Sequence, residues 1–317
     1  MINAPKISIV LPCYNEVDAL PITIQTLTSI LDNLSKSKLI CETSFILCCD
    51  DGSTDNTWSI IHSLHSQDSR IKGISLSHNK GHQNVLFAGL MSVMDKCDVA
   101  ISIDADLQDD PTAIEQMIHE YLNGKEIVYG VRSCRNVDSW FKRTSAHAFY
   151  KFQKKMGLET IYDHADYRLM SNRALHLLAE YGESNLFLRG IIPQIGLESS
   201  IVKYERKDRV AGKSKYSLRK MVSHSIDGIT SFSAKPMRMI FIIGLFLLLV
   251  DIIVAGYVLF SYFNNNTISG WTSLMLSIWF LGGLILMGLG IVGEYIGKIF
   301  VEVKHRPRYA IKEVLFD

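Results

Sequence analysis

Two long apolar runs near the C-terminus limit what this chain can fold into. Residues 239–263 and 272–292 are almost free of charged side chains, and each is about long enough to cross a bilayer core of roughly 30 Å as a helix. The loop between them, 264–270, carries no charge, whereas lysine and arginine flank the pair on both sides. We therefore expect two transmembrane helices joined by a short outer loop, with both chain termini in the cytoplasm.

The apolar pattern also divides the chain. Residues 1–215 have the length and composition of a folded domain, and 237–301 hold the two apolar runs. Between them, 216–236 place apolar residues at helical spacing among lysines and arginines, which is typical of a helix that lies on a membrane surface. Residues 302–317 are a basic tail that we expect on the cytoplasmic side.

The composition argues against two classes of protein. The 317 residues have a formal net charge of +1, which gives no sign of the basic surface of a nucleic-acid-binding protein. The six cysteines show neither the paired spacing of a zinc site nor a secreted disulfide framework, so we expect reduced thiols on a cytosolic face. The first residues lack the pattern of a signal peptide, and we expect none.

Short apolar runs alternate with helical stretches through the first 131 residues. The predicted strands are 7–12, 44–49, 71–76, 98–103 and 126–131, and the predicted helices include 18–34 and 81–95. This alternation favours an α/β fold in which a mostly parallel sheet is flanked by helices on both faces. From about residue 160 to residue 234 the pattern becomes irregular and polar.

Acidic side chains follow the ends of the predicted strands. Asp104, Asp106 and Gln108 come directly after the fourth strand, and Asp50 and Asp51 open the turn after the second. In such sheets, ligands bind beyond the carboxyl ends of the strands. Because Mg²⁺ takes one or two carboxylates and completes its shell with phosphate oxygens and water, these strand ends predict a cation site on a nucleotide diphosphate. The apolar runs indicate that a second substrate is a lipid.

Further motifs accompany these acids. The first strand ends in Pro12-Cys13-Tyr14-Asn15-Glu16, residues 163–169 read Asp-His-Ala-Asp-Tyr-Arg-Leu, and a basic loop occupies 209–216. With these motifs the chain resembles the family 2 glycosyltransferases of the GT-A fold. It is most similar to the polyisoprenyl-phosphate glycosyltransferases, which include dolichol-phosphate mannose synthase and the bactoprenol glucosyltransferases of O-antigen modification. The resemblance covers about residues 6–309.

The resemblance implies roles on the donor side. Pro12, Tyr14 and Glu16 would line the nucleoside pocket. Asp50 and Asp51 would accept hydrogen bonds from the base and ribose, with a helix cap as the alternative role.

The resemblance also implies a metal. Asp104, Asp106 and Gln108 would hold Mg²⁺ or Mn²⁺ on the donor diphosphate, with Asp106 and Gln108 as the direct ligands and Asp104 also beside the nucleotide. The cation would stabilise charge on the departing nucleotide.

Asp166 matches the position proposed in the family as the catalytic base. However, a lipid monophosphate with a second pKa of about 6 is already largely ionised at neutral pH and can attack without losing a proton. Asp166 has three alternative roles: it orients the sugar, it positions Arg168, or it forms a buried ion pair that only braces the loop.

Cations would offset the repulsion between a lipid phosphate and the diphosphate. The candidates, on motif position, are Arg132, Arg143, Arg168, Arg189, Arg209, Ser214 and Lys215, the last two through a loop whose backbone amides can also contact phosphate. Any of the basic residues can instead be a surface cation attracted to anionic lipid. The histidines, including His82, show no metal-ligand spacing, and we assign them structural roles.

The function implied by the resemblance is inverting transfer of a hexose, glucose by preference, from a UDP-sugar to undecaprenyl phosphate at the bacterial inner membrane. The product would supply a flippase and an outer-face glycosyltransferase, and the enzyme would be a homo-oligomer. The alternatives are the same reaction with GDP-mannose or a UDP-aminosugar, and a non-catalytic membrane adaptor or flippase component. A processive polysaccharide synthase normally carries a Gln-x-x-Arg-Trp element, which this sequence lacks.

Overall fold

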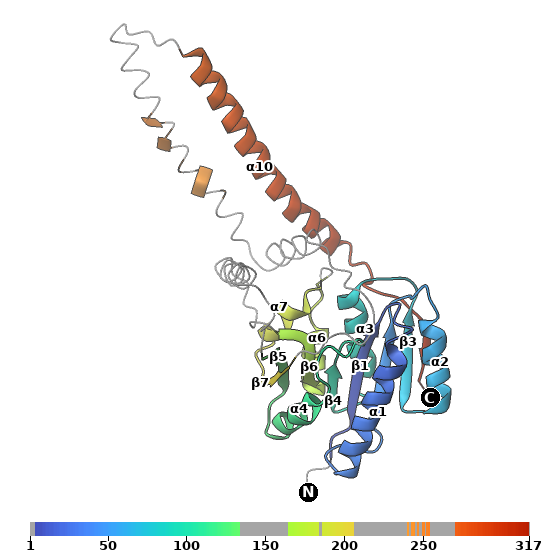
Figure 1. Cartoon of the computed structure of the whole chain (residues 1–317). Helices are drawn as coiled ribbons and strands as arrows, with labels where there is room; N and C mark the ends of the chain where they lie inside the picture. The colour runs from blue at the N-terminus through green and yellow to red at the C-terminus, as the bar shows by residue number, and fades with distance from the viewer. Residues whose placement is uncertain are drawn as a thin grey trace. The chain divides into compact units, whose positions relative to one another are not determined.

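The structure is a computed structural model, and it describes residues 4–133, 164–183, 186–205 and 270–316 with isolated positions between 240 and 253. The chain divides into two compact units. One contains the described residues up to 205 together with 306–316, and the other contains the long helix α10 (Trp271–Val303) (Figure 1).

An eight-stranded mixed sheet forms the first unit. Its strands are β1 (Ile7–Cys13), β2 (Phe45–Asp50), β3 (Ile71–Leu76), β4 (Val99–Ser102), β5 (Ile127–Arg132), β6 (His164–Ser171), β7 (Ser199–Tyr204) and β8 (Ile311–Leu315). Across the sheet the order is β7-β5-β6-β4-β1-β2-β3-β8. Strand β6 runs antiparallel to β4 and β5, β8 runs antiparallel to β3, and the other neighbours are parallel.

Helices cover both faces of this sheet (Figure 1). They are α1 (Leu20–Lys36), α2 (Thr57–Gln67), α3 (His82–Val93), α4 (Ala113–Leu122), α6 (Asn172–Ala179) and α7 (Leu188–Gln194). Helices α1 and α4 share one apolar core with β1 and β4. Helix α3 packs on the opposite face, where a Cβ on Gly89 would lie 2.5 Å from the Sγ atom of Cys49. Glycine is therefore what allows this close approach.

Apolar spacing explains the central elements. All seven residues of β1 are buried, as expected for a parallel strand covered on both faces. In α1 the buried residues include Leu20, Ile24, Leu27 and Leu31, which recur every three or four positions and form one apolar face. Burial of each such side chain stabilises the fold by about 1.5–3 kcal/mol. The five strands predicted in the first 131 residues are confirmed, with ends within about one residue of the prediction.

The interpretation of residues 160–234 as irregular was wrong for the part that the structure describes. This stretch contains β6, α6, α7 and β7, and β6 lies between β4 and β5 inside the sheet. The pattern failed because β6 carries Asp166 and Arg168 in its interior, where they are buried as an ion pair of 2.5 Å. A pair of charges interrupts the apolar run by which a central strand is recognised.

The apolar C-terminal region is described only in part. Helix α10 extends beyond the predicted 272–292, and its 33 residues correspond to roughly 50 Å. Its segment Phe280–Val303 is long and apolar enough to cross a membrane, and its large apolar side chains are exposed, for example Leu286 at 71%. Among the described residues it is the one helix of this kind. Only nine positions of the expected first span, 239–263, are among the described residues, so two spans are not confirmed.

The basic tail contains a strand that the sequence did not predict. After α10 the chain forms β8, which covers the edge of β3. The guanidinium of Arg308 lies 4.6 Å from the ring centroid of Phe87 in α3, and the ring of Tyr309 meets the same ring edge-on at 6.4 Å. Trp58 donates a hydrogen bond of 3.0 Å to Glu313. The C-terminus is thus part of the sheet-containing unit.

Candidate active site

Hydrogen bonds join the loops that follow β1 and β2. Asn15 has a φ of 54°, and its N–H donates to the Oγ atom of Ser53 at 3.0 Å. Tyr14 and Glu16 are half-buried in this loop, whereas Pro12 is buried inside β1. The predicted nucleoside-binding residues therefore lie at the carboxyl ends of two paired parallel strands, and their contact with a nucleoside stays a prediction.

The two acids at the end of β2 already accept hydrogen bonds from the protein. Asp50 accepts a bond of 2.9 Å from the Ser75 hydroxyl. Asp51 accepts bonds of 2.7 and 2.8 Å from the backbone N–H groups of Lys80 and Gly81, directly before α3. Burial raises the pKa of Asp51, although these N–H groups oppose that rise. Asp51 therefore fixes the backbone at the start of α3, which resembles the capping alternative, and its contact with the base or ribose stays a prediction.

The three predicted metal ligands lie in the turn that follows β4. Asp104, Asp106 and Gln108 are half-exposed and alternate with buried Ala105 and Leu107. The Gln108 N–H donates to Asp106 Oδ1 at 3.1 Å, and Leu107 has a φ of 52°. Two carboxylates and an amide thus lie within five residues of one turn, and each side chain is partly open to solvent.

This donor set fits a hard divalent cation. Carboxylate and amide oxygens are suitable ligands for Mg²⁺ or Mn²⁺. The described residues contain no group of three or more His, Cys, Asp or Glu side chains that could hold a metal by themselves. Oxygens of a donor diphosphate would therefore complete the shell. Burial, together with the charges of Asp166, Asp109 and Asp106, raises the pKa of Asp104 despite the opposing effect of His82, and a bound cation would relieve this unfavourable charge.

Asp166 is surrounded by donors from three elements. Arg168 in β6 donates to Oδ1 at 2.5 Å, and Arg189 in α7 donates to Oδ1 at 3.2 Å and to Oδ2 at 3.0 Å. From the first turn of α3, Gln83 donates to Oδ2 at 3.3 Å, and His82 Nε2 lies 3.3 Å from the same atom. Burial alone would raise the pKa of Asp166, but Arg189, His82 and Arg168 hold it well below its usual range.

The two arginines differ in exposure. The side chain of Arg168 is 1% exposed and lies in the sheet, whereas that of Arg189 is 43% exposed. Arg189 is therefore placed to meet a ligand, and Arg168 is placed to hold Asp166. The phosphate contacts predicted for both residues stay predictions.

Pairing between β4 and β6 brings the two acidic sites together. Ser102 is opposite Arg168, so the next antiparallel positions bring Asp166 level with Asp104. His82 Nε2 lies 3.7 Å from Asp104 Oδ1 and 3.3 Å from Asp166 Oδ2. Burial lowers the pKa of His82, but the two carboxylates raise it to about 9.

His82 and Gln83 are the residues that the sequence interpretation missed. His82 was assigned a structural role, but the structure places it between Asp104 and Asp166. The available signal was their position: Gly81-His82-Gln83 opens a helix just beyond the carboxyl end of a parallel strand, where ligands of such sheets bind.

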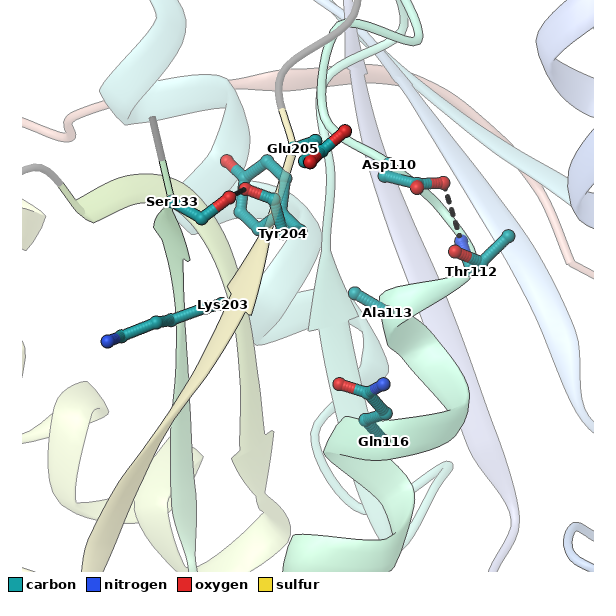
Figure 2. A pocket seen from close by; sticks show the side chains of 8 residues that line it. All are labelled: Asp110, Thr112, Ala113, Gln116, Ser133, Lys203, Tyr204 and Glu205. Carbon is teal, nitrogen blue, oxygen red and sulfur yellow. Dashed lines mark hydrogen bonds between the residues drawn. The ribbon is translucent and has the colours of Figure 1, made fainter. Parts of the chain in front are cut away.

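Arg132 is held at the ends of β5 and β7. It donates to Asp109 Oδ1 at 3.0 Å, and the Tyr204 hydroxyl donates to the same oxygen at 2.6 Å. Beside this network lies an open pocket of about 390 Å³, shown in Figure 2. Its lining consists of Asp110, Thr112, Ala113, Gln116, Ser133, Lys203, Tyr204 and Glu205. None of these eight lining residues is among the predicted site residues.

Four of the predicted acceptor-binding residues lie outside the described residues. They are Arg143, Arg209, Ser214 and Lys215. Their roles stay predictions.

Comparison with known proteins places this site in a family. Residues 8–192 match Glycosyl transferase family 2. The chain belongs to this family. It is 48% identical to the "Uncharacterized glycosyltransferase YkoT" of Bacillus subtilis (strain 168), over 99% of this chain and 94% of that protein. It is also 38% identical to the bactoprenol glucosyl transferase of Shigella phage SfV, over 97% of this chain and 98% of the relative.

Solved structures are similar at lower identity. Glucosyl-3-phosphoglycerate synthase from Mycobacterium tuberculosis, in complex with Mn²⁺, UDP and phosphoglyceric acid, is 17% identical, with a TM-score of 0.46 over 71% of this chain and 76% of that one.

The family assignment confirms the resemblance and the enzyme class. This family 2 glycosyltransferase has the GT-A α/β fold, with a mostly parallel sheet flanked by helices. Asp50 ends β2, Asp104 and Asp106 follow β4, and Asp166 lies near the start of the antiparallel strand β6.

Proposed function

We propose that this glycosyltransferase moves glucose from UDP-glucose to undecaprenyl phosphate or a related polyisoprenyl phosphate, at the cytoplasmic face of a membrane. The supporting observation is the length of the match: the 38% identity to bactoprenol glucosyl transferases covers 97% of this chain. That span includes the apolar C-terminal region as well as the GT-A domain. A relative that shared only the sugar-transfer domain would carry no information about a lipid acceptor.

On the donor side, Asp106 and Gln108 would hold Mg²⁺ or Mn²⁺ on the diphosphate, with Asp104 beside them. When bound, the cation supplies electrostatic stabilisation of the leaving nucleotide. Pro12, Tyr14 and Glu16 line the nucleoside pocket. The partial exposure of the three metal ligands supports their assignment, because Ala105 and Leu107 between them are buried while the three oxygen-bearing side chains remain open to a ligand.

On the acceptor side, an ionised phosphate oxygen attacks the anomeric carbon opposite the departing diphosphate. The configuration inverts, so an α-linked donor gives a β-linked lipid phosphate. No proton has to leave the nucleophile, and both oxygens of Asp166 already accept bonds from the protein. Asp166 therefore acts by holding Arg189, whose guanidinium offsets the charge of the approaching phosphate.

The membrane attachment comes from the C-terminal region. Helix α10 provides one span, and we propose 239–263 as the second because it is equally long and apolar. Lysine and arginine on both flanks then place the termini in the cytoplasm. The homo-oligomer, the flippase and the outer-face glycosyltransferase stay predictions from the resemblance.

The test uses the full chain in detergent with labelled UDP-glucose and a polyisoprenyl phosphate, with UDP-N-acetylglucosamine and GDP-mannose as parallel donors. We expect organic-extractable label from UDP-glucose, its loss with EDTA, and its return with Mn²⁺. If lipid-linked label came from one of the other donors instead, glucose would be replaced by that sugar in the proposal. No lipid-linked label from any donor would overturn the proposal and favour a non-catalytic membrane adaptor.

A further inference from the structure

The first turn of α3 is held in place from two directions. Before the helix, the carboxylate of Asp51 accepts the N–H groups of Lys80 and Gly81. One and a half turns further on, Arg308 and Tyr309 of the C-terminal tail contact the ring of Phe87. These contacts fix the position of helix α3, and so they also fix where the side chains of its first turn lie.

The side chain of His82 lies close to two carboxylates of like charge. Its Nε2 atom lies 3.7 Å from Asp104 and 3.3 Å from Asp166, and its side chain is 37% exposed. Asp104 belongs to the loop that faces the donor, whereas Asp166 holds the arginine that faces the acceptor. The imidazole of His82, which lies between the two carboxylates, offsets their repulsion and fixes their separation.

Gln83 makes contacts on both sides of its amide. Its Nε2 donates to Asp166 Oδ2 at 3.3 Å, and its Oε1 accepts the backbone N–H of Leu188 at 3.1 Å. Leu188 begins α7, and the next residue is Arg189. Gln83 thus links the start of β6 to the start of α7, the two elements whose relative position sets the Asp166–Arg189 ion pair.

We propose that His82 and Gln83 are positioning residues that set the Asp166–Arg189 pair against Asp104, so that the acceptor phosphate meets the donor in a reactive alignment. This inference rests on the proposed function. Without the two α3 contacts, Asp166 keeps its bonds to Arg168 and Arg189, but neither Asp166 nor the start of α7 is any longer fixed relative to α3. A displacement of about 1 Å near reacting groups can cost about 100-fold in rate.

The experiment compares matched variants of the full chain. His82→Ala removes the imidazole N–H, and His82→Gln restores an amide N–H near the Nε2 position. Gln83→Glu keeps the oxygen that accepts the Leu188 N–H but removes the N–H group that donates to Asp166. The control is His176→Ala, which breaks a surface His–Asp pair of 2.7 Å. The readouts are kcat, the KM for each substrate, and the affinity for UDP with Mn²⁺.

We expect His82→Ala and Gln83→Glu to lower kcat by about 30-fold, with the affinity for UDP and Mn²⁺ within about threefold of the original protein. His82→Gln should recover most of the rate, and His176→Ala should leave it unchanged. Should His82→Ala fail to fold, Gln83→Glu gives the same comparison.

Two results would overturn the inference in different ways. Equal losses for His82→Ala and His82→Gln, or an unchanged kcat in Gln83→Glu, defeat the positioning role while the proposed function stands. An unmodified chain that transfers no sugar to polyisoprenyl phosphate defeats the proposed function, and the inference fails with it.

Discussion

The acids at the end of β4 and the acid at the start of β6 are neighbours with opposite surroundings. Asp104 and Asp106 are half-exposed, and burial of the Asp104 carboxylate, together with negative charges near it, raises its pKa. The side chain of Asp166 is 6% exposed, and its pKa is lowered well below the usual range because two arginines and His82 surround it.

The difference indicates two roles for one residue type. Environments that push pKa values apart often separate the functions of paired carboxylates. The β4 acids carry charge that a cation from outside the protein can neutralise, whereas Asp166 already has its cations within the protein. We therefore expect the first set to bind the metal and the second to position arginine. The predictions below test that contrast.

The largest effect is expected at the metal site. Asp106→Asn keeps the shape of the side chain but removes a charged ligand, so kcat should fall by about 1000-fold at saturating Mn²⁺ while the thermal unfolding temperature stays the same. The rate of lipid-linked product formation measures this. Asp95→Asn, a change at a surface acid paired with His176, serves as the control and should keep full activity. Undiminished activity of Asp106→Asn would remove the metal assignment.

Asp166→Asn should damage both activity and stability. It leaves the buried Arg168 without its counter-charge, which should lower the free energy of unfolding by about 3 kcal/mol, and it should lower kcat by about 100-fold because Arg189 loses its anchor. Denaturant titration and initial rates measure the two effects. A loss of rate with unchanged stability would instead support direct chemistry by Asp166.

Arg189 should affect the lipid more than the nucleotide sugar. Arg189→Ala should raise the KM for polyisoprenyl phosphate by about tenfold, because one charge-assisted contact with phosphate is lost, and leave the KM for UDP-glucose within about twofold. Arg173→Ala, which removes an exposed ion pair with Glu126, is the matched control. The opposite ranking of the two KM values would contradict the acceptor role.

The smallest effect is a gain in stability. The folded-state pKa of Asp104 is raised, so its ionised form destabilises the fold, and this cost appears as pH rises above the unfolded value of about 3.9. At pH 7 and without metal, Asp104→Asn should therefore raise the unfolding temperature by about 2 °C, a small value because the side chain is partly exposed. A lower unfolding temperature for Asp104→Asn, as expected for Asp166→Asn, would contradict the proposed difference between the two acids.

Local apolar pattern made much of the fold predictable. Strands β1 to β5 are runs such as Ile-Ser-Ile-Val-Leu-Pro, which have few alternative structures, and the acids that follow them lie where parallel strands end. Strand β6 was missed because Asp166 and Arg168 compensate each other only after folding. Strand β8 was missed because its five residues are exposed for the most part and depend on β3 for pairing.

The site was predictable where one loop carries it and less so where several elements meet. Asp104, Asp106 and Gln108 share one loop, so spacing alone places them together. The positions of His82 and Gln83 beside Asp166 depend on how α3 lies on the sheet. Gln83 and Asp166, for example, are 83 positions apart in the sequence. No periodicity in the sequence encodes that contact.

The most direct test is a crystal structure of the full chain with UDP and Mn²⁺, in which anomalous scattering locates the metal. The account predicts Mn²⁺ bound by Asp106, Gln108 and diphosphate oxygens, with Asp166 still paired to Arg168 and Arg189. Mn²⁺ coordinated by Asp166, or UDP bound with no metal at the loop after β4, would contradict it.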